Sequence, residues 1–382
     1  MVLRAVHVMV GNWVVSGLLI SLVAGAVACI ALARLTQFEW RARRAEGDSG
    51  ESQSPGRAAV TAVLLLVCAP AAIFLAAGYT ESLFLALGIP AWLAGRRRRW
   101  VLAGVLTALA CTVRIDGAFE AAGIAVMFLL SRPKARDWAR SPALALPLAA
   151  VAGYFAYLKD ITGDWLAWLH AEQQGWARQL TSPVTAFRNS WDNAFGSGSG
   201  FGPGGATRGG FGRRGSSGRR VPGQGGFGPG GSGGGAGTGR PGGGSFGPGT
   251  GRAGTGVPGG GSGTASARHT FTGGRLGGVG TFGPWPFRLD ILVVLAGLAF
   301  MGWAVFRRRW AELTYVGIAV VTLATSTYYM SVAREALLWW PLLIALAIWL
   351  SRRRWLAGLC LVVSGAMMVG ISWLFLTGSW AG

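Results

Sequence analysis

The sequence predicts an all-α membrane protein, a polytopic bundle of about ten transmembrane or partly spanning helices. Hydrophobic residues make up 51% of the 382 residues and charged residues only 13%, and the mean hydropathy is +0.43. This composition is too apolar for an ordinary soluble domain. Apolar runs also recur along the chain, and most approach the ~20 helical residues that cross ~30 Å of hydrocarbon.

The apolar runs form an N-terminal helical part, residues 1–190, and a C-terminal helical part, residues 285–382. Runs of about 15 residues are short for a straight crossing, so we interpret them as tilted or broken helices, or as re-entrant segments buried by their neighbours. We expect crossings at residues 12–33, 58–76, 81–95, 100–113, 118–131, 142–158, 288–306, 312–330, 336–350 and 355–376.

Arginine clusters indicate which helix ends face the cytoplasm. If the crossings alternate, five basic loops lie on one side, and the positive-inside rule makes that side cytoplasmic. Arginine far outnumbers lysine, which together with abundant alanine and glycine is typical of a GC-rich bacterium, so we expect a multi-pass protein of a bacterial plasma membrane. The basic residues of these loops are Arg34, Arg41, Arg43, Arg44, Arg57, Arg96 to Arg99, Arg132, Lys134, Arg136, Arg140, Arg307 to Arg309 and Arg352 to Arg354.

Acidic residues show the opposite bias. A carboxylate at membrane depth is costly unless it faces a water-filled cavity or a partner, so the outer face is expected to hold the chemistry. Glu81, in "GYTESLFLALGIPAWLAGRRRRW", is the first candidate, although it could instead stabilise a helix N-terminus beside Thr80 or Ser82. The acids on the outer side, or just inside the membrane from it, are Glu81, Asp116, Glu120, Asp160, Asp164, Glu172, Asp192, Asp290 and Glu335.

The N-terminus conflicts with this orientation. An even number of crossings with the last basic loop inside places both termini outside, and residues 1–10 lack the basic region, apolar core and cleavage site of a signal peptide. We therefore expect that a first helix is missing before residue 1, through a misplaced start codon or a truncation.

Residues 196–280 are rich in Gly, Ser, Pro and Arg, and they predict a disordered extracytoplasmic loop because they cannot bury enough apolar surface to fold. The stretch "TRGGFGRRG" is typical of single-stranded nucleic-acid binding. Its outer location argues against that partner, so no nucleic acid is expected. A basic tether near anionic lipid or cell-wall polymer and an inert insertion remain as interpretations. The net charge of +20 reflects this segment and the inner arginines.

Cysteine and histidine usage predicts no metal or cofactor. Each of Cys29, Cys68, Cys111 and Cys360 lies in an apolar run without a second cysteine nearby, as expected for small buried residues. The three histidines are scattered along the chain.

Residues 157–178, "YLKDITGDWLAWLHAEQQGWAR", lie at the outer end of a crossing and mix charged groups with tryptophans. Asp164, His170 and Arg178 beside indole rings suit a sugar or a lipid headgroup at the interface. A plain amphipathic helix lying on the bilayer is the alternative.

The stretches "GYTESLFLAL", "RRRRWVLAGVLTALACTVRIDG", "YLKDITGDWLAWLHAEQQGWAR" and "SVAREALLWWPLLIALA", in this order, resemble the PIG-V-like mannosyltransferases, relatives of the second mannosyltransferase of GPI-anchor synthesis. These belong to the GT-C class of polytopic glycosyltransferases. The resemblance covers roughly residues 12–190 and 285–350. It implies transfer of mannose from a polyprenyl-phosphate sugar donor to a lipid or glycan acceptor on the non-cytoplasmic face, with membrane lipids as partners and without a nucleotide sugar.

That chemistry needs a carboxylate that takes the proton of the acceptor hydroxyl and cationic groups beside the leaving lipid phosphate. Arg114 and Arg334 lie at outer helix ends, in "TVRIDG" and "SVAREALLWWP", and are the more telling substrate-binding candidates. The alternative is a structural ion pair, for instance with Asp116 or Glu335. The full set of substrate-binding candidates is Arg114, Asp116, His170, Arg178 and Arg334.

The resemblance has one gap. GT-C enzymes carry their essential acid in the first outer loop, and this chain starts downstream of it, which matches the missing first helix. Either the protein is longer or it cannot catalyse the transfer, and Glu81 and Asp164 are the remaining candidate catalytic residues. Two non-catalytic interpretations stay open: a transporter, which should show matching broken helices in two halves, and a membrane scaffold that presents the basic loop.

Overall fold

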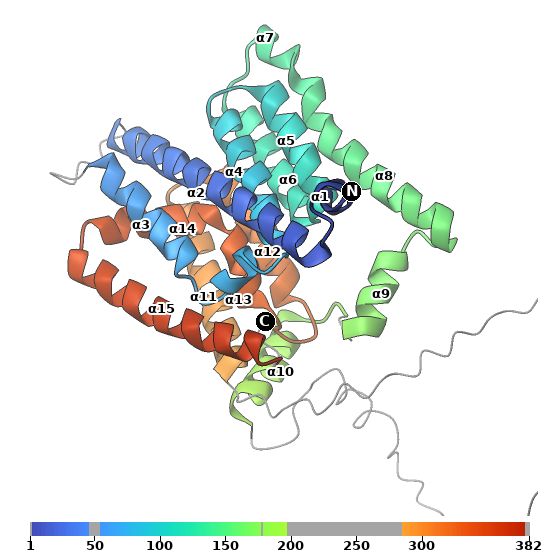
Figure 1. Ribbon diagram of the computed structural model, residues 1–382. Helices are drawn as coiled ribbons and strands as arrows, with labels where there is room; N and C mark the ends of the chain where they lie inside the picture. Colours follow the sequence, from blue (N-terminus) through green and yellow to red (C-terminus); the bar gives the residue numbers. More distant parts are fainter. Residues whose placement is uncertain (1, 46–53, 177–178, 197–284, 379–382) are drawn as a thin grey trace, which may run out of the picture. The chain divides into compact units, whose positions relative to one another are not determined.

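The computed structural model describes residues 2–45, 54–176, 179–196 and 285–378, and within these ranges the chain is helical, with one isolated bridge between Leu180 and Ser326 (Figure 1). The all-α fold is therefore confirmed. The helices are α1 (Val2–Val10), α2 (Trp13–Ala45), α3 (Pro55–Val67), η1 (Ala72–Leu75), α4 (Glu81–Arg96), α5 (Trp100–Val113), α6 (Asp116–Leu130), α7 (Ala135–Trp138), η2 (Ser141–Ala145), α8 (Leu146–Thr162), α9 (Ala167–Trp176), α10 (Pro183–Phe195), α11 (Trp285–Phe306), α12 (Trp310–Ala324), α13 (Val332–Glu335), η3 (Ala336–Leu338), α14 (Trp340–Ser351) and α15 (Arg354–Leu376).

Four helical segments of the described chain are long and apolar enough to cross a membrane: α2, residues 141–162, α11 and α15. The segments 332–338 and 340–351 could form a fifth span, bent by 79° at the break between them. α3, α5 and α12 are shorter apolar helices. Each of the ten expected crossings contains helix, but only four or five have the length and composition of a full span. The runs 81–95, 100–113 and 118–131 are short helices, as the sequence indicated, whereas 58–76 and 312–330 were expected to be longer than the helices α3 and α12 that they contain.

Several helix boundaries differ from the sequence prediction, and those of the runs 12–33 and 58–76 differ most clearly. α2 continues past residue 33 to Ala45, because the arginine-rich stretch after the apolar run is also helical. Its 33 residues span about 50 Å at 1.5 Å per residue, more than the hydrocarbon thickness. The run 58–76 breaks after Val67, near Pro70, and resumes as the short helix η1.

The sequence Arg-Arg-Arg-Trp occurs at three helix connections, and at two of them, α4 to α5 and α11 to α12, it forms the same tight turn. In each turn the middle arginine, Arg98 or Arg308, has a left-handed backbone, with φ of 56° and 53°. The next N–H, of Arg99 or Arg309, donates to the carbonyl five residues earlier at 2.8 Å. This is the Schellman pattern that closes helix C-termini, usually with glycine. The turns therefore make two antiparallel helix pairs with their arginines at the connected end.

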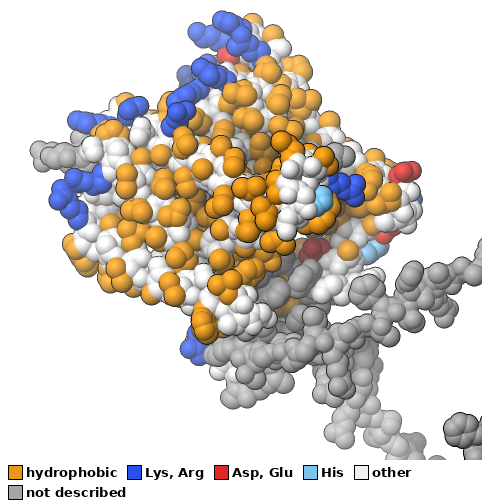
Figure 2. Space-filling model, viewed as in Figure 1, with side chains coloured by type: hydrophobic (Ala, Val, Ile, Leu, Met, Phe, Trp, Pro, Cys, Tyr) orange, Lys and Arg blue, Asp and Glu red, His pale blue; other side chains and the backbone are white. Residues whose placement is uncertain are grey.

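The basic loops meet at one end of the bundle. Glu39 of α2 forms ion pairs with Arg96 at 2.6 Å and Arg309 at 3.4 Å, so it joins α2 to both arginine turns. Arg98 lies 3.5 Å from Asp137 in α7. Figure 2 shows lysine and arginine gathered at the top and left of the molecule, while the flanks are mainly hydrophobic. This arrangement is that of a membrane protein whose cationic loops share one face.

Large aromatic side chains fill the centre between α4, α12 and α14. Trp340 is fully buried, and its ring centre lies 4.7 Å from that of Tyr315, 6.1 Å from that of Phe84 and 6.2 Å from that of Trp92. Gly123 of α6 makes room for this cluster, since a Cβ there would lie 2.9 Å from the Trp92 ring. The N-terminal and C-terminal helical parts therefore share one core, in which α12 also packs on α6 and α14 on α3.

The disordered loop predicted for residues 196–280 lies outside the described residues except for Gly196. The chain on either side of it is in contact. Arg288 of α11 donates from Nε to the Ala194 carbonyl of α10 at 3.0 Å, and its guanidinium lies 4.7 Å from the Phe195 ring centre. Residues 194–195 and 288 thus lie side by side.

Candidate functional site

The ends of α4, α5, α6 and α13 that lie away from the arginine turns meet in a cluster of charged side chains. α4 begins at Glu81 after a turn at Gly78, whose φ is 77°. Arg114 ends α5 in an extended conformation, and α6 begins two residues later at Asp116. The α5–α6 corner is tight, because a Cβ on Gly117 would lie 2.6 Å from the Cys111 nitrogen. Local chain geometry therefore brings Glu81, Arg114 and Asp116 to the same end of the bundle.

Arg114 is at the centre of this cluster, and all three of its guanidinium nitrogens have partners. Nε donates to Asp116 Oδ2 at 2.9 Å. Nη1 donates to Glu81 Oε1 at 3.1 Å and to Thr80 Oγ1 at 3.3 Å. Nη2 donates to Glu335 Oε1 at 2.5 Å. Three carboxylates from three helices therefore hold one guanidinium.

Arg334 of α13 binds the same carboxylate oxygen as Arg114. Its Nε donates to Glu81 Oε1, and its guanidinium carbon lies 4.5 Å from the ring centre of Tyr79 and 4.8 Å from that of Phe74. These aromatic faces favour a cation in this position. The two arginines singled out by the sequence thus converge on one acid.

The start of α13 is held from α11 and α10. Asp290 Oδ1 accepts a hydrogen bond from the Ala333 N–H at 2.9 Å. The buried Ser190 of α10 accepts one from the Tyr329 N–H at 2.8 Å. Ser331, between them, has a left-handed backbone with φ of 60°. The loop that carries Arg334 is therefore held by two helices, α10 and α11, which come before and after residues 197–284 in the sequence.

The cluster is largely removed from water and carries an excess of negative charge. The Glu81 side chain is 0% exposed, and its Oε2 is buried with no hydrogen-bond partner among the described residues. Three carboxylates, those of Glu81, Asp116 and Glu335, face two guanidinium groups. Buried ions in such pairs are strongly coupled, and removing one partner leaves the others unpaired.

Glu120 lies one helical turn below Asp116 and is fully buried. Neither of its carboxylate oxygens has a hydrogen-bond partner among the described residues. The absence of a side chain at Gly88 makes room for it, because a Cβ there would lie 2.8 Å from Glu120 Oε2. An isolated acid of this kind at membrane depth is a candidate functional group.

Asp164 and His170 form a separate pair between α8 and α9. Asp164 Oδ2 lies 2.6 Å from His170 Nδ1, and Oδ1 accepts from the Leu166 N–H at 2.8 Å. The Leu166 N–H, followed by the His170 ring, lowers the pKa of the Asp164 carboxyl below its ordinary value. In Figure 1, α9 lies apart from α13, and no described ion pair joins these residues to the Arg114 cluster.

The structure thus brings together Glu81, Arg114, Asp116 and Arg334, and it places Asp164 and His170 elsewhere. Arg178 lies outside the described residues. Glu335 was expected among the outer acids and as an ion-pair partner but not as a site residue, and no sequence pattern indicated the hydrogen bond from Arg114 to Thr80. The alternative that Glu81 stabilises a helix N-terminus fits in part: α4 begins at Glu81, but the hydroxyl of the preceding Thr80 accepts from Arg114 rather than from the helix backbone.

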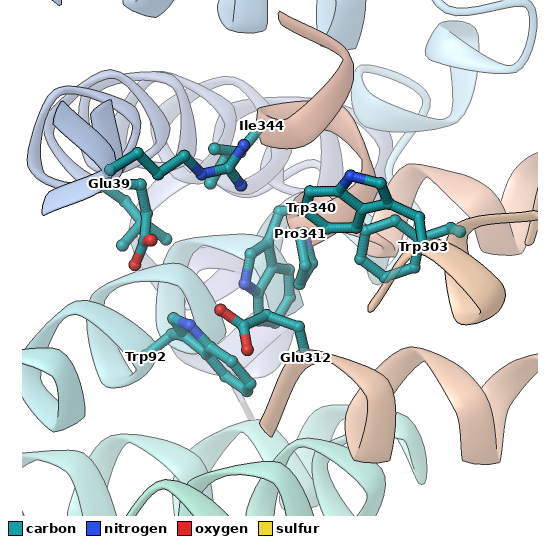
Figure 3. Close-up of a pocket in the computed structure, with 10 residues that line it drawn as sticks. Glu39, Trp92, Trp303, Glu312, Trp340, Pro341 and Ile344 are labelled. Carbon is teal, nitrogen blue, oxygen red and sulfur yellow. The ribbon is translucent and has the colours of Figure 1, made fainter. Parts of the chain in front are cut away.

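Among the described residues, no group of three or more His, Cys, Asp and Glu side chains is arranged to hold a metal ion. The described cavity lies at the other end of the bundle, beside the arginine turns (Figure 3). Figure 3 shows Glu39 and Glu312 facing one another across it, with Trp92, Trp303 and Trp340 on its walls. Glu39 already forms ion pairs with Arg96 and Arg309. The acid on this wall of the cavity therefore has a structural role in joining helices, and we do not assign the cavity to a substrate.

A comparison with known proteins finds similarity to a mannosyltransferase over a limited part of the chain. Over 102 residues the chain is 34% identical to "GPI mannosyltransferase 2" of Yarrowia lipolytica, strain CLIB 122 / E 150. The match covers 26% of this chain and 28% of that protein, so the chain spans far less than two thirds of the relative's length. No family model and no solved structure matches. The chain is therefore an all-α membrane protein that is similar, over about a quarter of its length, to a mannosyltransferase.

Proposed function

We propose that the chain is a membrane glycosyltransferase that transfers a hexose, mannose, from a polyprenyl-phosphate carrier to a lipid or glycan acceptor on the non-cytoplasmic face of a bacterial plasma membrane. One observation carries the proposal. Arg114 and Arg334 converge on Glu81 at the bundle end opposite the arginine turns, where a lipid-borne phosphate would be reached from the outer leaflet. The partial similarity to a mannosyltransferase supports the choice of sugar.

The transfer forms a bond between the acceptor oxygen and the anomeric carbon and breaks the bond between that carbon and the phosphate oxygen. The electron pair of the broken bond stays on the lipid phosphate, whose negative charge grows. Two guanidinium groups held in place before the reaction stabilise that charge without reorganisation. Glu81, which binds both, is the residue that orients them.

The acceptor proton needs a base, and the chain offers two. Glu81 has the buried oxygen Oε2, which has no hydrogen-bond partner among the described residues, while its other oxygen binds two guanidinium groups. The Asp164–His170 pair is the second, because a carboxylate on Nδ1 leaves Nε2 of the ring as the proton acceptor. The variants Glu81→Gln and His170→Ala distinguish these two candidate bases. The base is the residue whose substitution lowers kcat while the affinity for the donor is unchanged.

A transporter is disfavoured by the helix breaks. It should show matching broken helices in its two halves. In the described part of the chain the two breaks do not match: the one between residues 332–338 and 340–351 belongs to a bent pair long and apolar enough to span a membrane, whereas the one after Val67 leads only into the short helix η1. The first of these breaks places Arg334 and Glu335 in the cluster, which suits a site built at one end of the bundle rather than a pathway through it.

The test is mannosyl transfer in membranes that contain the full chain, with radiolabelled polyprenyl-phosphate mannose as donor. We expect transfer that falls at least about 100-fold in Arg334→Ala, the size of effect seen when a group that stabilises transition-state charge is removed. Arg97→Ala, at an exposed position in the α4–α5 turn, is the matched control and should retain activity. Full activity in Arg334→Ala at equal expression would rule out the proposed site.

A further inference from the structure

The ion pair between Arg114 and Glu335 is the outermost contact of the charged cluster. The Glu335 side chain is 21% exposed, against 12% for Asp116 and 0% for Glu81. Of the three carboxylates on Arg114, Glu335 is therefore the one that loses least when it leaves, since water already reaches it. An incoming anion would also meet Glu335 first.

The remaining contacts of Arg114 do not depend on Glu335. Nε is held by Asp116, and Nη1 is held by Glu81 and Thr80. If Glu335 moved away, Arg114 would keep its orientation and present only Nη2. The described hydrogen bond of Arg334 uses its Nε, so this contact with Glu81 does not occupy its terminal nitrogens.

Glu335 lies in a short helical segment, α13, whose few backbone hydrogen bonds allow small adjustments when its side chain changes partner. α13 has four residues, too few to be stable as an isolated helix, and it enters from the left-handed residue Ser331. The chain then bends by 79° into α14. Arg334 is fixed by Glu81 and by two aromatic rings, whereas Arg114 is the one described partner of the Glu335 carboxylate.

We propose that Glu335 occupies an anion subsite built for the phosphate of the lipid-linked donor, and that donor binding exchanges the carboxylate for the phosphate on Arg114 Nη2. This inference rests on the proposed function and names the atoms that bind its substrate. A sugar-bearing polyprenyl phosphate is a phosphodiester with one negative charge, so the exchange preserves the charge balance at Arg114.

The same exchange assists product release. After transfer, the lipid phosphate is a monoester with a charge of about −1.5 to −2 at pH 7. Two arginines alone would retain this product more tightly than the donor. Return of Glu335 to Nη2 offsets that gain, because the carboxylate competes for the same guanidinium nitrogen.

Binding of farnesyl phosphate to the purified full chain in nanodiscs tests the subsite. Glu335→Gln keeps the shape and an acceptor oxygen but removes the competing charge, so we expect its Kd to be roughly two- to fivefold lower than that of the wild type, the scale of a partly exposed ion pair. Asp192→Asn, which removes an exposed charge from α10, should leave the Kd unchanged. Farnesol and inorganic phosphate separate recognition of a lipid phosphate from recognition of the lipid or of phosphate alone.

A second measurement uses the wild-type protein and does not depend on the variant folding. Displaced from Arg114, Glu335 should react more readily with a water-soluble carbodiimide and an amine, read by mass spectrometry, when farnesyl phosphate is added and not when farnesol is added. The proposed subsite is refuted if the Kd of Glu335→Gln is equal to or higher than that of the wild type. It is also refuted if labelling of Glu335 is unchanged by farnesyl phosphate. Mannosyl transfer is scored separately: tighter binding by Glu335→Gln with no transfer by the wild type would refute the enzyme and leave the anion subsite standing.

Discussion

At the scale of single residues, Arg114 organises the candidate site. Its three nitrogens join α4, α6 and α13 through Glu81, Asp116 and Glu335. A buried ion is stabilised only while its partners and hydrogen bonds are present, so the cluster behaves as a unit. The same contacts that fix the Arg114 guanidinium therefore also hold the helix ends together.

Arg114→Ala should destabilise the protein by about 3–5 kcal/mol, because it leaves three carboxylates without their shared cation. Thermal unfolding in detergent measures this as a fall in Tm. Arg114→Lys keeps the charge but cannot reach all three acids, so its Tm should lie between those of the alanine variant and the wild type. A Tm for Arg114→Ala that equals that of the exposed-turn variant Arg97→Ala would show that the cluster is not structural.

Asp164 makes a pH-dependent contribution to the α8–α9 connection. Its folded pKa is below the ordinary value, first through the Leu166 N–H and then through His170, so folding favours the charged carboxylate. The contribution is complete above the unfolded pKa of about 3.9 and is lost as pH falls through the lower folded pKa. Hydrogen exchange at the start of α9 should accelerate over that acidic range in the wild type, and Asp164→Asn should abolish the pH dependence. The same acceleration in Asp164→Asn would assign it to another group.

At the scale of elements, the loop before α13 is held by α11 and α10. Asp290→Ala removes the acceptor of the Ala333 N–H, so Arg334 should lose its fixed position while its own side chain is intact. We expect the KM for the lipid-linked donor to rise more than kcat falls, with little change in Tm. Asp290→Asn retains an acceptor oxygen and should restore the KM. If Tm and kcat fell together while KM stayed constant, Asp290 would be a structural residue only.

Helix α4 passes the buried acid Glu120 at Gly88, and this contact can be tested by adding one methyl group. A Cβ at residue 88 would lie 2.8 Å from Glu120 Oε2 and 2.9 Å from the Trp340 ring, so Gly88→Ala should cost about 1–3 kcal/mol through overpacking. Gly153→Ala in α8 has no neighbour within 4 Å of its Cβ and should stabilise by about 0.5–1 kcal/mol. Comparing the two variants separates crowding from helix propensity. Equal Tm shifts for the two would mean that α4 does not pack closely on α6.

At the scale of the whole molecule, composition and charge predicted the fold class because lipid permits few solutions. A chain with this mean hydropathy must satisfy its backbone within helices, and the arginine runs mark which ends lie together. The break at Val67 was not predicted, and a break in the short run 336–350 was one of its interpretations without a position, since an apolar run looks alike in a straight helix and in a bent one. The lengths of the helices in the runs 58–76 and 312–330 were overestimated for the same reason, since α3 ends at Val67 and α12 at Ala324.

The candidate site was predicted in part. Arg114 and Arg334 stood out because isolated arginines at outer helix ends are rare among apolar residues, and Asp116 followed from its place beside Arg114. Their meeting at Glu81 depends on how α4, α5 and α13 pack, which no local pattern encodes. Asp164 and His170 share the same outer polarity but belong to another helix connection, so sidedness alone could not separate the two groups.

Deletion of residues 200–280 tests the scaffold interpretation against the enzyme. Because Ala194 and Arg288 are already in contact, a short linker can join α10 to α11 without moving either helix. Mannosyl transfer by the deletion variant should remain within about twofold of the wild type, since shortening a loop changes its closure entropy only slowly. Loss of transfer with a normal Tm would assign an active role to the deleted segment and favour the scaffold.

The space that Gly88 leaves for Glu120 links two positions 32 residues apart in the sequence. Neither can change freely while the other keeps its present size: a methyl group at 88 needs a shorter residue at 120, and a lost carboxylate at 120 leaves a gap that a larger residue at 88 can fill. In an alignment of orthologues, positions 88 and 120 should therefore vary together, with glycine at position 88 wherever position 120 is an acid.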